Sequence, residues 1–175
     1  MGNSEVSKSS FWTNLFKPKA EKSELEQVLT SMPPFQDLSP AFINGIIKLM
    51  HNRVYVAGEV IFHQGDPGAG LYIIINGQIT IKQEDEGNTW ELTKLSRGDF
   101  FGELALLDNE RRSATAVAIA ETQVLVIFKP DLDNFISNNP KEGIKILKGM
   151  AHIIAIRLRN LNQDYFQLYK QMKNN

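Results

Sequence analysis

Residues 101–116, with the sequence FGELALLDNERRSATA, combine residue types that together can bind an anion. Gly102 lets the backbone approach a ligand closely because it has no Cβ atom. The apolar run that follows predicts one helical turn, whose first N–H groups, at Leu104 and Ala105, would point toward a phosphate. Arg112 can neutralise that phosphate with paired hydrogen bonds. The stretch therefore predicts a compact phosphate site.

Glu103 does not fit a site that binds phosphate alone, because a carboxylate repels a phosphate. It fits if its oxygens accept a hydrogen bond from a neutral donor such as a ribose hydroxyl. The alternative is that Glu103 forms an ion pair with the arginines at positions 111 and 112. The first interpretation predicts a nucleotide ligand whose sugar and phosphate are held side by side.

The composition is that of a globular domain, since 42% of the 175 residues are hydrophobic and 22% are charged. Residues 1–22 hold four lysines and two glutamates, and residues 141–175 hold seven basic and two acidic side chains. The total charge of −1 therefore leaves −8 on the residues between them. Such an acidic body argues against binding a nucleic acid backbone.

Missing residue types restrict the function further. The chain has no cysteine, which excludes thiolate ligands and fits a reducing compartment. His51, His63 and His152 are scattered, without the spacing of a metal site. No window reaches the roughly 18 apolar residues of a membrane span, and residues 1–22 lack the apolar core of a signal peptide. We expect a cytoplasmic protein with no stable membrane insertion, no metal or cofactor and no enzymatic activity.

Short β-runs separated by tight turns predict a barrel or sandwich. They span residues 54–56, 60–62, 71–75, 79–81, 90–95 and 115–128. Asn76 and Gly77 are typical of a two-residue hairpin, and residues 84–88 predict a second hairpin. Two helices are expected within residues 21–50, with Pro40 first in the second helix, and another at 131–137. The expected fold class is mainly β with α: a jelly-roll β-barrel with N-terminal helices and a long C-terminal dimerisation helix.

The chain is expected to be helical from residue 141 almost to its end. Apolar residues recur there in steps of three and four, and we call them the seam: Ile144, Leu147, Ala151, Ile154, Leu158, Leu161, Tyr165, Leu168 and Met172. This spacing is typical of a coiled coil, so we predict a homodimer through this helix. Four apolar residues off the seam predict that the first half also packs on the barrel: Ile146, Met150, Ile153 and Ile156.

Three divisions follow from these patterns: a flexible segment at 1–22, a barrel domain at 23–138 and a coiled-coil helix at 139–175. In the first division, Phe11, Trp12, Leu15 and Phe16 recur at one-turn helical spacing. They predict a short helix folded back on the domain, a peptide that docks on a partner, or a weak membrane-surface anchor.

The residues also resemble a known family. The runs LYIIINGQI, GDFFGELALL and RRSATA, preceded by IFHQGDPG and followed by a long helix, resemble the cyclic nucleotide-binding domains of catabolite activator proteins and protein kinase A regulatory subunits. The resemblance covers roughly residues 25–162. It implies a jelly-roll barrel with a phosphate-binding cassette at residues 101–115, called the cassette below.

The resemblance implies a role for each residue of the site. The implied binding residues are Phe101, Gly102, Glu103, Leu104, Ala105, Arg112, Ser113, Ala114, Arg157, Asn160 and Asn162. Glu103 would bind the ribose 2′-hydroxyl and Arg112 the cyclic phosphate, while the three residues of the C-terminal helix would lie near the base. Many relatives have proline where this chain has Arg111, so both arginines are candidate ligands, with Arg112 favoured.

The function that the resemblance implies is a stand-alone receptor for cyclic AMP or cyclic GMP. Ligand would move a hinge near residues 129–137 and the long helix, and the dimer would signal to an unidentified protein partner. Activator-type relatives continue into a helix-turn-helix domain, whereas this sequence ends at Asn175, so we expect no nucleic acid partner. The alternative is an adaptor that keeps the fold and the coiled coil but binds no nucleotide.

Overall fold

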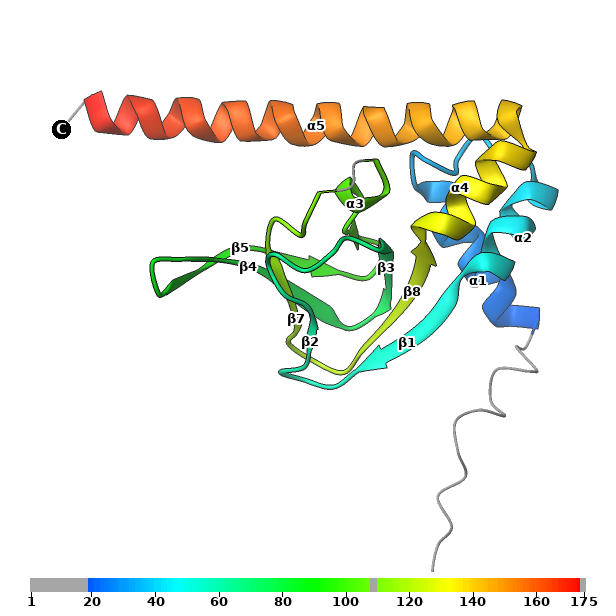
Figure 1. The fold of residues 1–175 in the computed structure, drawn as a ribbon, viewed down its shortest axis with the longest axis horizontal. Coiled ribbons are helices and arrows are strands. Elements are labelled where there is room, and N and C mark those ends of the chain that lie inside the picture. Colours follow the sequence, from blue (N-terminus) through cyan, green and yellow to red (C-terminus); the bar gives the residue numbers. More distant parts are fainter. Residues whose placement is uncertain (1–18, 108–109, 174–175) are drawn as a thin grey trace, which may run out of the picture.

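The computed structural model describes residues 19–107 and 110–173 and shows a β-barrel flanked by short helices, with one long helix running across it (Figure 1). The elements are α1 (Lys19–Ser31), α2 (Pro40–Leu49), β1 (His51–Tyr55), β2 (Val60–Phe62), β3 (Gly70–Asn76), β4 (Gln78–Asp85), β5 (Asn88–Ser96), β6 (Phe100–Phe101), α3 (Leu104–Leu107), β7 (Thr115–Ala118), β8 (Thr122–Phe128), α4 (Lys129–Asn138) and α5 (Pro140–Lys173). The predicted segment at 11–16 lies outside the described residues.

Two four-stranded antiparallel sheets form the barrel, in the orders β1-β8-β3-β6 and β2-β7-β4-β5. Alternation along β3 explains how one sheet serves two cores. Leu71 and Ile73 pack with the helices, whereas Tyr72 and Ile74 pack inside the barrel with β4 and β8. The predicted fold class is confirmed: a jelly-roll-like barrel with N-terminal helices and a long C-terminal helix.

The hairpin predicted at Asn76 and Gly77 is wrong. β3 pairs with β8 and β6, whereas β4 pairs with β5 and β7, so the chain passes here from one sheet to the other. Gly77 has φ of +92°, and a Cβ atom on it would lie 2.4 Å from the Glu121 carbonyl oxygen. The second hairpin is confirmed, because Glu86 and Gly87, both with positive φ, connect β4 to β5.

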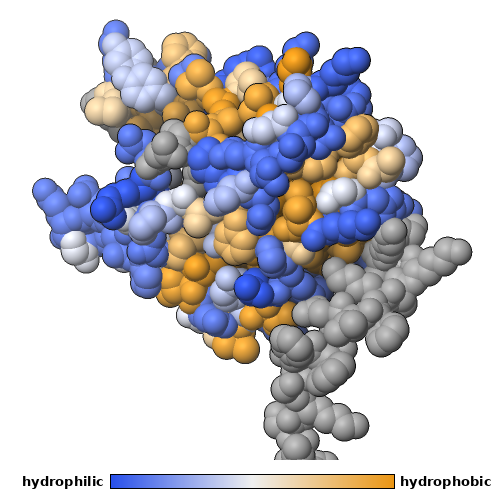
Figure 2. All heavy atoms as spheres, turned by 45° about the vertical axis from the view of Figure 1, so that its right-hand side comes forward, coloured by the Kyte–Doolittle hydropathy of each residue, from blue (hydrophilic) through white to orange (hydrophobic). Residues whose placement is uncertain are grey.

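α5 presents two different faces over its 34 residues. The face toward the domain is buried at Gly143, Ile146, Gly149, Met150 and Ile153. The seam lies about a quarter turn away and is exposed except at the half-buried Ile154, with Leu161 at 64% and Met172 at 74% of full exposure. The space-filling view shows apolar side chains reaching the surface along the top, where α5 runs (Figure 2). Of the four residues expected to pack on the barrel, Ile146, Met150 and Ile153 are buried, whereas Ile156 is 38% exposed, on the flank of the buried stripe.

Gly149 is required for the close packing of α5 on the turn after α1. A Cβ atom there would lie 2.1 Å from the Pro33 carbonyl oxygen and 2.5 Å from Pro34 Cα. We expect Gly149→Ala to lower the free energy of unfolding by about 1–3 kcal/mol, although alanine favours helix by about 1 kcal/mol. Urea denaturation measures this change. The control His152→Ala, at an exposed site of the same helix, should change stability little; equal stability of Gly149→Ala and the parent would contradict the close contact.

Candidate functional site

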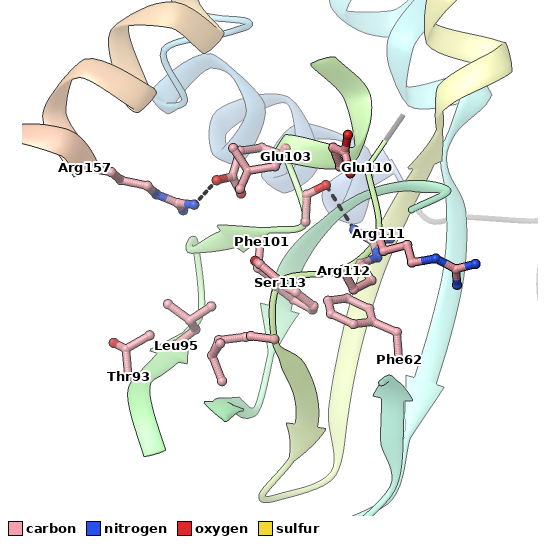
Figure 3. Close-up of a pocket in the computed structure, with 14 residues that line it drawn as sticks. Phe62, Thr93, Leu95, Phe101, Glu103, Glu110, Arg111, Arg112, Ser113 and Arg157 are labelled. Carbon is pink, nitrogen blue, oxygen red and sulfur yellow. Dashed lines mark hydrogen bonds and ion pairs between the residues drawn. The ribbon is translucent and has the colours of Figure 1, made fainter. Parts of the chain in front are cut away.

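A cavity of about 620 Å³ opens between the barrel, the cassette and α5 (Figure 3). Its lining residues are Phe62, Ile81, Thr93, Leu95, Phe101, Gly102, Glu103, Leu104, Glu110, Arg111, Arg112, Ser113, Ala114 and Arg157. The volume lies in the range of small-molecule sites. Eight of the eleven predicted binding residues are therefore brought to one cavity: Phe101, Gly102, Glu103, Leu104, Arg112, Ser113, Ala114 and Arg157.

Arg112 is buried at the inner end of this site, with 6% of its surface exposed. Its guanidinium lies 4.1 Å from the centre of the Phe62 ring. Nη1 donates to the Gly102 carbonyl at 3.2 Å and Nη2 donates to the Gly70 carbonyl at 3.1 Å. Nε is buried without a hydrogen-bond partner within the described residues. Burial lowers the pKa of Arg112 from its usual value, against the opposing effects of Tyr72 and Glu103.

Gly102 makes room for that guanidinium. Its φ is +77°, and a Cβ atom on it would lie 2.6 Å from Arg112 Nη1 and 2.9 Å from the Gly70 carbonyl oxygen. The main chain of Arg112 is also held, because its N–H donates to the Asp66 carbonyl and its carbonyl accepts from the Gly65 N–H, each at 2.8 Å. The cassette thus presents one arginine in a defined position.

Arg111 has a different environment. Its side chain is exposed and donates from Nη1 to the Gly65 carbonyl at 2.7 Å. In Figure 3 it extends away from Phe62 and Arg112. Both candidate arginines therefore line the cavity, but only Arg112 is buried in it.

Glu103 is 5% exposed and forms an ion pair with Arg157 of α5, drawn as a dashed line in Figure 3. Arg157 also donates from Nη2 to the Phe100 carbonyl at 3.1 Å. The partner of the Glu103 carboxylate is thus neither Arg111 nor Arg112 but a residue of the long helix. This pair connects the cassette directly to α5.

The other two helix residues of the predicted site do not line the cavity. Asn160 and Asn162 are both exposed on α5. Asn160 follows Arg157 by three residues and lies on nearly the same side of the helix, whereas Asn162 is turned about 140° away from Arg157. Their predicted contact with a base stays a prediction. Ala105 lies in α3, next to Leu104 of the cavity wall.

α3 is a single helical turn that is tied to the next helix. The Leu106 N–H donates to the Glu103 carbonyl at 3.0 Å, and the Leu106 carbonyl accepts from Lys129 Nζ at 2.9 Å. Lys129 opens α4 and is also paired with Asp133 at 3.2 Å. The cassette therefore contacts both helices that follow the barrel.

Sequence reasoning missed the strand residues of the cavity: Phe62, Ile81, Thr93 and Leu95. Ile81 pairs with Thr93, so β4 and β5 present these side chains on a common face. The alternation of Thr93 with Leu95 was the available signal. It shows that two side chains share a face, but it does not show which face borders the cassette.

Two other kinds of site are absent from the described residues. Residues 19–107 and 110–173 contain no group of three or more histidine, aspartate or glutamate side chains that could hold a metal ion. In that same part of the chain, no helix is both long and apolar enough to cross a membrane.

Known proteins are similar to this chain in both sequence and architecture. A family profile described as Cyclic nucleotide-binding domain matches residues 52–139, about half of the chain. A Cyclic AMP receptor protein of Thermus thermophilus is 34% identical over 133 residues, which cover 75% of this chain and 60% of that protein. This chain thus spans less than two thirds of that relative's length.

Solved structures agree with this result. The catabolite activator protein of Thermus thermophilus superposes with a TM-score of 0.69 at 32% identity, covering 78% of this chain and 62% of that one. The regulatory domain of Toxoplasma gondii PKA with cAMP gives a TM-score of 0.65 at 27% identity, over 69% of this chain and 46% of that one. The profile, the relatives and the architecture agree, and the chain belongs to the cyclic nucleotide-binding domain family.

Proposed function

We propose that this chain is a non-enzymatic receptor for a cyclic mononucleotide, cyclic AMP or cyclic GMP. The observation that carries the proposal is the buried guanidinium of Arg112, which opens on a cavity that also holds the carboxylate of Glu103. The guanidinium donates to two neutral carbonyls, and its Nε is unpaired within the described residues. A bound anion would offset the cost of burying that charge.

The phosphate, the ribose and the base of such a ligand would each bind a different part of the cavity. The cyclic phosphate would lie on Arg112 and the first N–H groups of α3, and the ribose 2′-hydroxyl would donate to Glu103. The base would lie against the apolar wall of β4 and β5, near Thr93 and Arg157. The similar regulatory domain of Toxoplasma gondii PKA was crystallised with cAMP, which supports this class of ligand.

The contacts of the site suggest how binding is transmitted. Glu103 is paired with Arg157, so a ribose hydroxyl that donates to Glu103 competes with α5 for the same carboxylate. Lys129 connects the end of α3 to the start of α4. Ligand would shift the population of positions of α4 and α5 by its different affinity for each. The signal would then pass from α5 to a protein partner.

We also propose a homodimer through the seam. The domain-facing stripe of α5 turns polar beyond Arg157, where Asn160, Asp164 and Gln167 continue it. The seam remains apolar to Met172 and exposed along the same stretch. An exposed apolar stripe of this length supports pairing with a second helix that covers it.

We expect nucleotide-free protein to bind cyclic AMP or cyclic GMP with micromolar or tighter affinity, and to bind the 2′-deoxy form of that ligand tenfold or more weakly. The reason is that a hydrogen bond to a buried carboxylate contributes about 1.5–3 kcal/mol. Glu103→Ala should reduce this preference to about one. Titration calorimetry with both nucleotides, their 2′-deoxy forms and a cyclic dinucleotide measures it. Glu91→Ala is the control, because Glu91 bonds Thr80 on the face of the sheet opposite to Ile81 and Thr93.

A second candidate is an adaptor that binds no nucleotide. The ion pair of Glu103 with Arg157 favours it, because the chain itself then satisfies the carboxylate assigned to the ribose. The same titration decides between the two functions. If nucleotide-free protein releases no heat with any of the ligands, the receptor is excluded and the adaptor is favoured.

A further inference from the structure

Trp90 is not a lining residue of the cavity, but it lies on the same face of β5 as Thr93, which is one. Ile81 of β4 pairs with Thr93, and both line the cavity. Two residues further along β4, Gln83 pairs with Trp90. A register shift after Ile81 leaves two β5 residues opposite Lys82, which returns Trp90 to the face of Thr93 although three positions separate them. Trp90 is thus the next side chain outward from the cavity on this strand.

Contacts on the other face of the sheet support this placement. Thr80 pairs with Lys94 on the face opposite to Ile81. Glu91 belongs to that face, since its Oε2 accepts from Thr80 Oγ1 at 3.0 Å and its Oε1 lies 3.3 Å from Lys94 Nζ. The neighbour of Glu91 in the strand, Trp90, therefore faces the other way.

The segment that carries Trp90 is fixed relative to the cassette. Gln64 donates from Nε2 to the Glu84 carbonyl at 3.2 Å, and its Oε1 accepts from the Glu84 N–H at 2.9 Å. Glu84 pairs with Thr89, the residue next to Trp90. The Gln64 N–H donates to Thr115 Oγ1, at the end of the cassette, at 2.9 Å. These bonds fix the main chain opposite Thr89, the neighbour of Trp90, relative to the cassette.

We propose that Trp90 stacks on the base of the bound cyclic nucleotide. The inference rests on the proposed function, which places the base against Ile81, Thr93 and Leu95. Figure 3 shows Thr93 and Leu95 on β5, at the opposite margin of the cavity from Phe62. The rise of a strand puts the next residue on the same face about 7 Å further out, where the planar base of the ligand would project. Trp90 is 48% exposed, so a base can cover its indole.

Stacking on an indole has a characteristic selectivity. Aromatic side chains contribute to base binding through the π-face, which every base offers. Loss of one such contact lowers affinity by about tenfold to a hundredfold. It does not alter the contacts of the sugar and phosphate, so a ligand without a base should not respond to a substitution of Trp90.

The test uses the tryptophan content of the chain, which has Trp12 and Trp90 only. In a Trp12→Phe background, emission excited at about 295 nm reports Trp90 alone. We expect cyclic AMP or cyclic GMP to change that emission with the midpoint found by calorimetry. Trp90→Leu should bind the nucleotide about tenfold or more weakly, while Trp90→Phe should stay within about threefold of the parent. The base-free sugar 1-deoxyribose 3,5-cyclic phosphate should bind the parent and Trp90→Leu equally.

The possible outcomes distinguish the stacking of Trp90 on the base from the proposed receptor function. Parent protein that binds no cyclic nucleotide overturns both. Parent protein that binds, with Trp90 emission unchanged at saturation or with parent affinity in Trp90→Leu, overturns the stacking alone. Equal weakening of the nucleotide and the base-free sugar in Trp90→Leu would show a general distortion of the site and would also overturn it. Thermal denaturation of Trp90→Leu provides the check on folding.

Discussion

Arg112→Ala is expected to weaken cyclic nucleotide binding by about a thousandfold or more, whereas Arg111→Ala should stay within about threefold of the parent. Arg112 is buried inside the cavity, where a charged hydrogen bond to phosphate is not screened by water. Two such bonds contribute about 4 kcal/mol, which corresponds to about a thousandfold in affinity. Arg111 is exposed and held by the Gly65 carbonyl. Titration calorimetry of both variants measures the difference.

Folding and binding must be separated for Arg112, because its guanidinium also bonds two carbonyls and packs on Phe62. Arg112→Lys keeps the charge but loses the paired geometry, so an intermediate affinity is expected. Binding is to be measured well below the thermal midpoint of each variant. Loss of binding in Arg111→Ala with binding retained in Arg112→Ala would reverse the assignment.

The fold could be predicted from the sequence because its signals are local. Short β-runs, the acidic turn before β5 and the proline that opens α2 each predict an element within a few residues. The pairing of strands far apart in sequence is not a local property. Asn76 and Gly77 have the residue types of a hairpin, yet the chain passes from one sheet to the other at these residues. Gly77 is needed there because the Glu121 carbonyl leaves no room for a side chain.

The candidate site, like the fold, combines residues that have a local sequence signal with contacts that have none. The cassette is continuous in sequence, so the spacing of Gly102, Glu103 and Arg112 was sufficient to place them in one cavity. The ion-pair partner of Glu103, Arg157, lies 54 positions further along the chain. The ring that packs against the Arg112 guanidinium is that of Phe62 in β2. Neither contact has a sequence signal of its own. The fold supplies both, since it brings α5 and β2 to the two sides of the cassette.

The second large effect is expected from substitutions in the seam, through which we propose that the chain forms a homodimer. We expect the parent to be a dimer at tens of micromolar, and the double variant Leu161→Asp with Leu168→Asp to be a monomer. Leu161 and Leu168 are 64% and 59% exposed in the single chain, so neither substitution disturbs the domain core. In a coiled coil both positions would be buried, and two unpaired carboxylates there should raise the dissociation constant about a thousandfold or more. Sedimentation velocity measures the oligomeric state.

The matched control places the same charges on the other stripe of the helix. Gln167→Asp with Gln171→Asp lies on the polar continuation of the domain-facing stripe, at exposed positions next to those of the test. It changes helix propensity and net charge in a similar way, because all four new residues are aspartates. The control variant should therefore remain a dimer. A monomeric parent at tens of micromolar, or equal dissociation of both double variants, would contradict pairing through the seam.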